Sequence, residues 1–162
     1  MSSPVYVFTL NGGKGKWSRY THPFAIDAFA QLGNVLYIRT GDYVVRVDED
    51  AVTDSVAGVE TDFGGVVWWS WLDFGQPGVT KMLEAFDYVG TGQGPSLAVG
   101  YDQRNVATFT TPYQLSNDTL PGTPTPFPIA APTLSVKLTF AGGAAWQVQA
   151  VNLYLDDMAG QP

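Results

Sequence analysis

The segment LSVKLTFAGGAAWQVQA, residues 134–150, has the most regular pattern in the chain and decides its fold class. From Leu134 to Phe140 an apolar residue occupies every second position, with polar residues between. Successive side chains of a strand point to opposite faces, so this alternation predicts a strand with one buried face. Gly142-Gly143 predicts a turn, after which residues 146–150 alternate again. We therefore predict a hairpin of two antiparallel strands.

The segments that precede this hairpin are also rich in β-branched and aromatic residues. We expect further strands at residues 66–71, 86–89, 97–101 and 107–110. Residues 80–89 also contain good helix formers, but the alternation at their end favours a strand.

Five prolines lie between residues 121 and 132, where we expect a loop or an extended arm rather than a central strand. Together these segments predict an antiparallel β-sandwich over residues 66–157, followed by a flexible tail at 158–162.

The amino-terminal part repeats the pattern with shorter segments. Strands are expected at residues 5–10, 17–20, 35–39 and 43–47, joined by turns that contain glycine. Residues 1–50 are thus expected to form one four-stranded antiparallel sheet. The acidic, glycine-bearing residues 51–65 are expected to form a linker loop. The predicted class is all-β.

The composition indicates a protein that associates with others. Charged residues make up 14% of the 162 residues, against about a quarter in an average soluble domain. A surface with so little charge is typical of a protein that is partly covered in an assembly. The net charge of -7 disfavours tight binding of nucleic acid. No apolar run reaches the length of a membrane span, and synthesis in the cytoplasm is expected.

No group of residues predicts catalysis, a metal or a cofactor. The chain has no cysteine, and its single histidine, His22, has no nucleophile partner in the sequence. Lys14 and its neighbouring glycines lack the spacing of a phosphate-binding loop. The acidic residues around Asp48 and Asp54 lack the spacing of a calcium loop, so we interpret them as solvated. We expect a protein that is not an enzyme.

The aromatic segment at residues 68–74 is the candidate interface or ligand site. Alternation places Trp69 and Trp71 on one face of their strand and Trp68 on the other, with Phe74 after the strand. One face is expected in the core and the other in an assembly interface. The alternative is a carbohydrate-binding sandwich, in which exposed aromatic rings stack on host surface glycans.

Several segments together resemble the tail hub or nozzle proteins of short-tailed bacteriophages, of the packaged-DNA stabilisation and tail tubular protein B type. The resemblance runs through residues 5–157. It consists of similar short sequence segments and does not include a catalytic signature. The segments that carry it are KWSRY (16–20), HPF (22–24), LYIR (36–39), YVVR (43–46), WLDFGQPGVTK (71–81), YDQRN (101–105) and NLYLDD (152–157).

The resemblance implies a virion structural protein, commonly a hexameric ring that extends the portal channel. Genomic DNA would pass through such a ring without tight binding, next to other tail or portal-connector proteins. It also implies that residues 1–50 form a propeller-blade-like sheet and that the chain corresponds to the carboxy-terminal portion of longer relatives. A single blade cannot close a propeller. It must therefore pack on the second half, pair between subunits or belong to a split protein.

Overall fold

The computed structural model describes residues 2–48, 50–51, 53–92, 94–115 and 124–157. The described residues form fourteen β-strands and no helix, and every strand pair is antiparallel. The predicted all-β class is confirmed. Within these residues no helix is long and apolar enough to cross a membrane. The chain divides into two compact units, Met1–Phe63 and Gly64–Pro162.

Unit 1 consists of three small sheets. Its strands are β1 (Ser3–Asn11), β2 (Lys14–His22), β3 (Ala28–Leu32), β4 (Val35–Thr40), β5 (Tyr43–Arg46), β6 (Thr53–Val56) and β7 (Val59–Asp62). The pair β1-β2 forms one sheet, β3-β4-β5 the second and β6-β7 the third. The single four-stranded sheet expected for residues 1–50 is therefore replaced by a two-stranded and a three-stranded sheet.

Three strands of unit 1 were not expected from the sequence. Strand β3 was not expected, and the loop predicted for residues 51–65 contains the hairpin β6–β7. This hairpin turns at Ala57-Gly58, where both residues have positive φ, of 56° and 78°. A two-residue turn with positive φ at both positions matches the right-handed twist of the strands that it joins. It usually contains asparagine or aspartate before glycine. Because alanine occupies that position, Gly58 was the sole turn signal at this point of the sequence.

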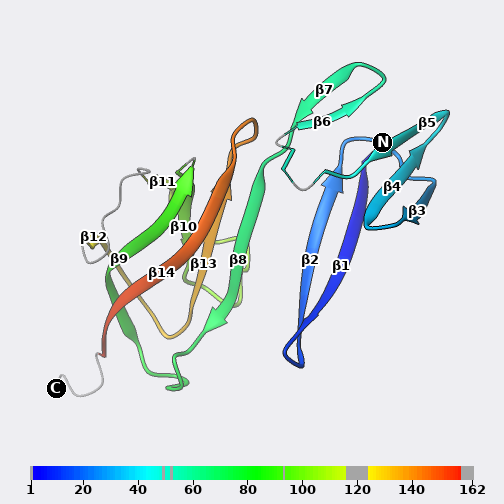
Figure 1. The fold of residues 1–162 in the computed structure, drawn as a ribbon. Coiled ribbons are helices and arrows are strands. Elements are labelled where there is room, and N and C mark those ends of the chain that lie inside the picture. Colours follow the sequence, from blue (N-terminus) through cyan, green and yellow to red (C-terminus); the bar gives the residue numbers. More distant parts are fainter. Residues whose placement is uncertain (1, 49, 52, 93, 116–123, 158–162) are drawn as a thin grey trace. The chain divides into compact units, whose positions relative to one another are not determined.

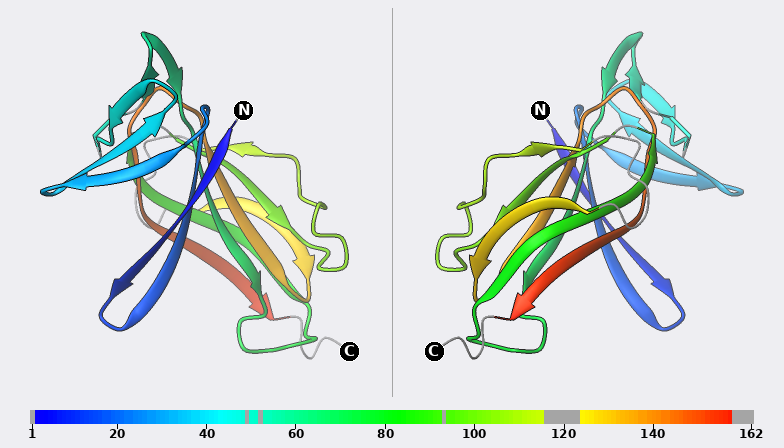
Figure 2. Two further views of the ribbon diagram at one scale, coloured as in Figure 1. Left: turned by 90° about the vertical axis from the view of Figure 1, so that its right-hand side faces the viewer. Right: turned by 90° about the vertical axis from the view of Figure 1, so that its left-hand side faces the viewer.

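Unit 2 is a two-layered β-sandwich, as predicted for residues 66–157. Its strands are β8 (Gly65–Leu72), β9 (Lys81–Gly92), β10 (Ser96–Gly100), β11 (Tyr113–Gln114), β12 (Thr125–Ala131), β13 (Leu134–Phe140) and β14 (Trp146–Asp157). One sheet has the order β11-β10-β13-β8 and the other β12-β9-β14 (Figure 1). The right-hand view of Figure 2 shows β12, β9 and β14 as the nearer layer.

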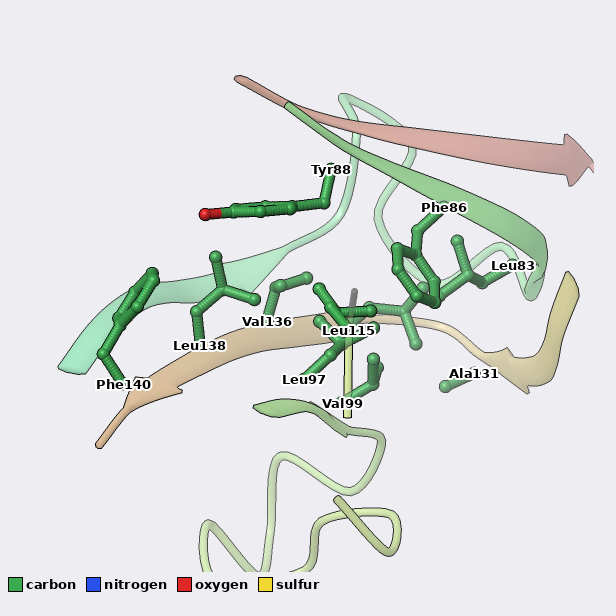
Figure 3. Packing of buried hydrophobic residues seen from close by; sticks show 11 residues of the cluster. Leu83, Phe86, Tyr88, Leu97, Val99, Leu115, Ala131, Val136, Leu138 and Phe140 are labelled. Carbon is green, nitrogen blue, oxygen red and sulfur yellow. The ribbon is translucent and has the colours of Figure 1, made fainter. Parts of the chain in front are cut away.

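The core of unit 2 lies between these two sheets. Figure 3 shows Phe86 and Tyr88 of β9 directed toward Val136 and Leu138 of β13. All four side chains are at most 1% exposed. A bulge in β9 leaves Glu84 without an opposite residue, so Leu83 and Phe86 both face inward although they are three positions apart. This irregularity explains why the sequence pattern of residues 80–89 was ambiguous.

The predicted hairpin of residues 134–150 is wrong. Strand β13 pairs with β10 and β8, whereas β14 pairs with β9 in the opposite sheet. Residues 141–145 therefore cross from one layer to the other. The rings of Phe140 and Trp146 stack at 3.8 Å where the chain crosses. An alternating pattern shows only that one face of a strand is buried. Strands β13 and β14 both bury a face in the same core, although they do not pair with each other.

Two further segments depart from expectation. Residues 107–110 form no strand, and only an isolated bridge joins Phe109 to Gly100. The proline-rich segment, expected to be a loop or arm, contains strand β12 at the edge of its sheet. The ladder is interrupted between Pro126 and Ile129. An edge strand needs hydrogen-bond donors on one side only, so it tolerates prolines that a central strand would exclude.

Candidate functional site

A β-bulge in β8 decides which tryptophans face outward. Leu72 lies opposite Leu134 and Trp69 opposite Val136, so Ser70 and Trp71 together lie opposite a single residue of β13. Such a bulge reverses the facing of the side chains beyond it. Trp69 consequently points into the core, whereas Trp71 joins the outer face.

The prediction that Trp69 and Trp71 share a face is therefore wrong. Trp71 instead lies on the same side of the sheet as Trp68. An added Cβ at Gly100 would lie 3.1 Å from the Trp71 ring and 3.3 Å from the Phe109 ring. We name Trp68, Trp71 and Phe109 the outer aromatic cluster.

The indole of Trp68 is exposed and at the same time fixed. Its side chain is 55% exposed, yet its Nε1 donates a hydrogen bond of 2.6 Å to Oγ of Ser135. Ser135 is fully buried, and its hydroxyl donates to the main-chain oxygen of Trp69 at 2.9 Å. The only hydrogen-bond donor of the indole is thus satisfied within the protein. What remains for a ligand is the flat apolar face of the ring.

Phe109 and Lys137 complete this surface. The Phe109 ring meets the Trp68 ring edge to face, with centroids 5.9 Å apart and planes at 66°. Nζ of Lys137 lies 4.2 Å from the centre of the Phe109 ring, within the range of a cation–π contact. Lys137 is also directly opposite Trp68 in the strand ladder. The result is a corner of two aromatic rings with an ammonium group beside it.

Lys137 differs from the other two cations of unit 2. Lys81 is 1% exposed and donates to the main-chain oxygens of Gln76 and Pro132. Arg104 lies 3.4 Å from a carboxylate oxygen of Asp102. Among the described residues no carboxylate lies within 4.0 Å of the Lys137 ammonium. Its charge is therefore available to a ligand.

Phe74 lies apart from this cluster. It follows β8 in the turn toward β9, has a positive φ of 54° and is 40% exposed. None of the ring contacts in the described part of the chain joins Phe74 to Trp68 or Trp71. Of the four aromatic residues singled out by sequence, the structure thus brings two together on the outer face.

Unit 1 carries a second unusual surface, on the β1–β2 hairpin. One face of the hairpin presents Tyr6, Phe8, Leu10 and Trp17, which are between 49% and 70% exposed. Phe8 and Trp17 face each other across the strands with ring centroids 4.8 Å apart. Gly15 lies beneath the Phe8 ring, where an added Cβ would be 2.4 Å from ring carbons. We name these four residues the apolar ribbon.

The ionisable residues considered by sequence lie in small local contacts. Nδ1 of His22 lies 3.5 Å from Oδ2 of Asp54, too far for a good hydrogen bond. Asp48 accepts a bond from the main-chain N–H of Asp50 and pairs with Arg46 at 2.5 Å, and these contacts lower its pKa. In the described residues no three His, Cys, Asp or Glu side chains are grouped as metal ligands would be.

Two of the hollows in the described part of unit 2 have no ionisable residue in their linings. One has a volume of about 90 Å³ and lies between the sheets, and the other has a volume of about 530 Å³. The first is lined by Trp69, Leu72, Val136, Val151 and Leu153, the second by Thr91, Gly92, Ala145, Trp146 and Gln147. Neither lining contains a side chain that could act as a general acid or base.

Phe109, Lys137 and Ser135 were missed by sequence reasoning. Phe109 was assigned to a strand, and the other two appeared only as polar positions of β13. The separations along the chain are large, since Trp68 and Ser135 are 67 residues apart. The single available signal was the polar face of β13. It indicates which side of the sheet faces solvent, and aromatic residues of neighbouring strands on that side would lie next to it.

Comparison of the chain with family models, curated proteins and solved structures finds no match.

Proposed function

We propose that the chain is a non-enzymatic structural subunit of a bacteriophage tail, a hub, nozzle or connector component that assembles with copies of itself into a ring. The observation that carries the assembly is the exposure of apolar side chains in unit 1. Of the 21 large hydrophobic residues exposed in the described chain, 14 lie in residues 1–63. Ile38 is the one hydrophobic residue of that unit buried in the described structure.

We expect a unit with so small a core to be marginally stable by itself. Ordering the backbone costs about 1–2 kcal/mol per residue, and buried apolar area is the main term that offsets it. A two-stranded hairpin such as β1–β2 is marginal in water without a surface to pack on. Its outer edges are also unpaired in the described sheets, which makes them templates for another chain. Association with further copies would supply both the missing area and the missing partners.

The tail setting is supported by the resemblance over residues 5–157 and by the charge. A net charge of -7 suits a channel wall past which DNA slides without binding. In this proposal the neighbours are other tail or portal-connector proteins, and the mature location is the virion.

The test is the oligomeric state of the full chain and of ribbon variants. Mass photometry and sedimentation should give a closed oligomer for the wild type, and electron microscopy should show a ring. Phe8→Ser with Trp17→Ser should dissociate it, because both side chains are exposed on the apolar ribbon. Tyr154→Ser, an exposed aromatic on β14, is the matched control and should leave assembly intact. A strict monomer at micromolar concentration would contradict the proposal.

A further inference from the structure

We infer that the outer aromatic cluster of unit 2 is a binding site for an acidic saccharide, with one pyranose ring stacked on Trp68 and its carboxylate at Lys137. This site shares no residue with the apolar ribbon, and the inference does not depend on the assembly proposed above. Three features of the surface support it: the fixed indole of Trp68, the angle between the Trp68 and Phe109 rings, and the ammonium group of Lys137.

The fixed ring argues for a ligand with a flat, weakly polar face. A half-exposed indole usually turns its N–H toward water. Here Ser135 holds that N–H from below, so the ring cannot rotate without losing a hydrogen bond of 2.6 Å. A ring fixed in this way loses little entropy when a ligand stacks on it. The C–H face of a pyranose ring is apolar and flat, which matches what the indole offers.

The corner between Trp68 and Phe109 limits the size of the ligand. The planes of the two rings are at 66° to each other. A sugar that stacks on the Trp68 ring would therefore contact the Phe109 ring with its own edge. Gly100 beneath them has no side chain, and an added Cβ would approach both Trp71 and Phe109. The bulge at Ser70 and Trp71 is what places Trp71 beside this glycine. Bulges often re-aim side chains next to binding sites.

The charge of the ligand follows from Lys137. Residues 64–162 contain seven acidic and three basic side chains, so a cation without a carboxylate partner is unusual in this unit. Lys137 has none within 4.0 Å among the described residues, whereas Arg104 is paired and Lys81 is buried. Its ammonium lies over the Phe109 ring, at the edge of the corner. A uronic or sialic acid stacked on Trp68 would place a carboxylate near it.

The experiment is a glycan array that carries uronic-acid and sialic-acid saccharides together with their neutral counterparts, probed with the full chain. We expect binding to acidic saccharides and about tenfold weaker binding to the neutral ones. The best-bound saccharide is then titrated by calorimetry against variants. Trp68→Ala and Lys137→Gln should each weaken binding about tenfold. Both positions lie on the outer face, and circular dichroism verifies that the variants fold.

Matched controls separate the site from general effects. Tyr154→Ala removes an exposed aromatic from the opposite sheet, and Lys14→Gln removes an exposed cation from unit 1. Both should bind as the wild type does.

An array without hits, equal binding of neutral and acidic saccharides, or unchanged binding by Trp68→Ala would each overturn the inference. Loss of self-association in Trp68→Ala would overturn it too, since a second copy would then occupy the cluster. The ribbon variants should retain saccharide binding, so the two proposals fail independently.

Discussion

Ser135 shows how one small residue fixes the position of a large one. It is fully buried between Trp68 and Trp69, and it accepts from the first and donates to the second. A hydroxyl with both functions satisfied costs little to bury, and its removal leaves two groups without a partner.

Replacing Ser135 by alanine tests this role directly. We expect Ser135→Ala to lower the free energy of unfolding by about 1 kcal/mol, because the Trp69 oxygen loses its donor. The indole proton of Trp68 should also exchange faster with solvent in NMR spectra. Ser70→Ala, at an exposed position on the neighbouring strand β8, is the control and should change stability by less than about 0.5 kcal/mol. An unchanged exchange rate of the Trp68 indole would show that the hydrogen bond does not fix the ring.

Tyr88 gives a residue-scale prediction in alkaline solution. Burial raises the pKa of its phenol above the ordinary value of 10.0, because the charged form is poorly solvated in the core. A group whose pKa is raised in the folded state adds stability at low pH. That stability is fully present below the unfolded pKa and is lost as pH rises through the folded pKa.

The measurement for Tyr88 is a pH titration of both absorbance and stability. Tyrosinate absorbance should show a step above pH 10 that is missing in Tyr88→Phe. The decline of unfolding free energy in this range should be less steep in the variant. A wild-type titration without that late step would refute the assignment.

At the scale of elements, the sequence predicted most of the longer strands of the sandwich, but it predicted their partners poorly. Alternation marked both β13 and β14, because each buries one face. It could not show that the chain crosses between layers at residues 141–145, since both a hairpin and a crossing satisfy the same pattern. The bulges in β8 and β9 break the period of two and are set by packing between distant strands. Their effect on Trp71 was therefore not predictable.

The crossing between layers depends on the absence of a side chain at Gly65. A Cβ there would lie 2.1 Å from the Trp146 ring, and that ring is held by stacking on Phe140. We expect Gly65→Ala to destabilise the protein by about 1–3 kcal/mol, as overpacking does in a dense interior. Urea unfolding monitored by tryptophan fluorescence measures the change. A neutral substitution would mean that Trp146 moves freely, against the stacked geometry.

For the molecule as a whole, the low charge led us to expect a surface that is partly covered in an assembly, but it could not locate that surface in the chain. The low charge of the chain pointed to association, and the acidic bias argued against nucleic acid. Neither could show that unit 2 contains nearly all of the described core, whereas unit 1 exposes most of its large apolar side chains. That contrast arises because the strands of unit 1 form three small sheets rather than two facing layers. The candidate site was predictable only in part, since Trp68 and Trp71 were named but Phe109, Ser135 and Lys137 were not.

This contrast predicts two levels of protection against hydrogen exchange. Amides of β9 and β13 lie in the sandwich and should exchange only through global unfolding. Amides of β1 and β2 should exchange with little protection in dilute protein, because the hairpin alone is marginal. Raising the concentration should protect them as copies associate, since binding to the folded form stabilises it by mass action. Exchange measured by mass spectrometry across a concentration series tests this. Protection of residues 3–22 that is strong and independent of concentration would show that the hairpin needs no second copy.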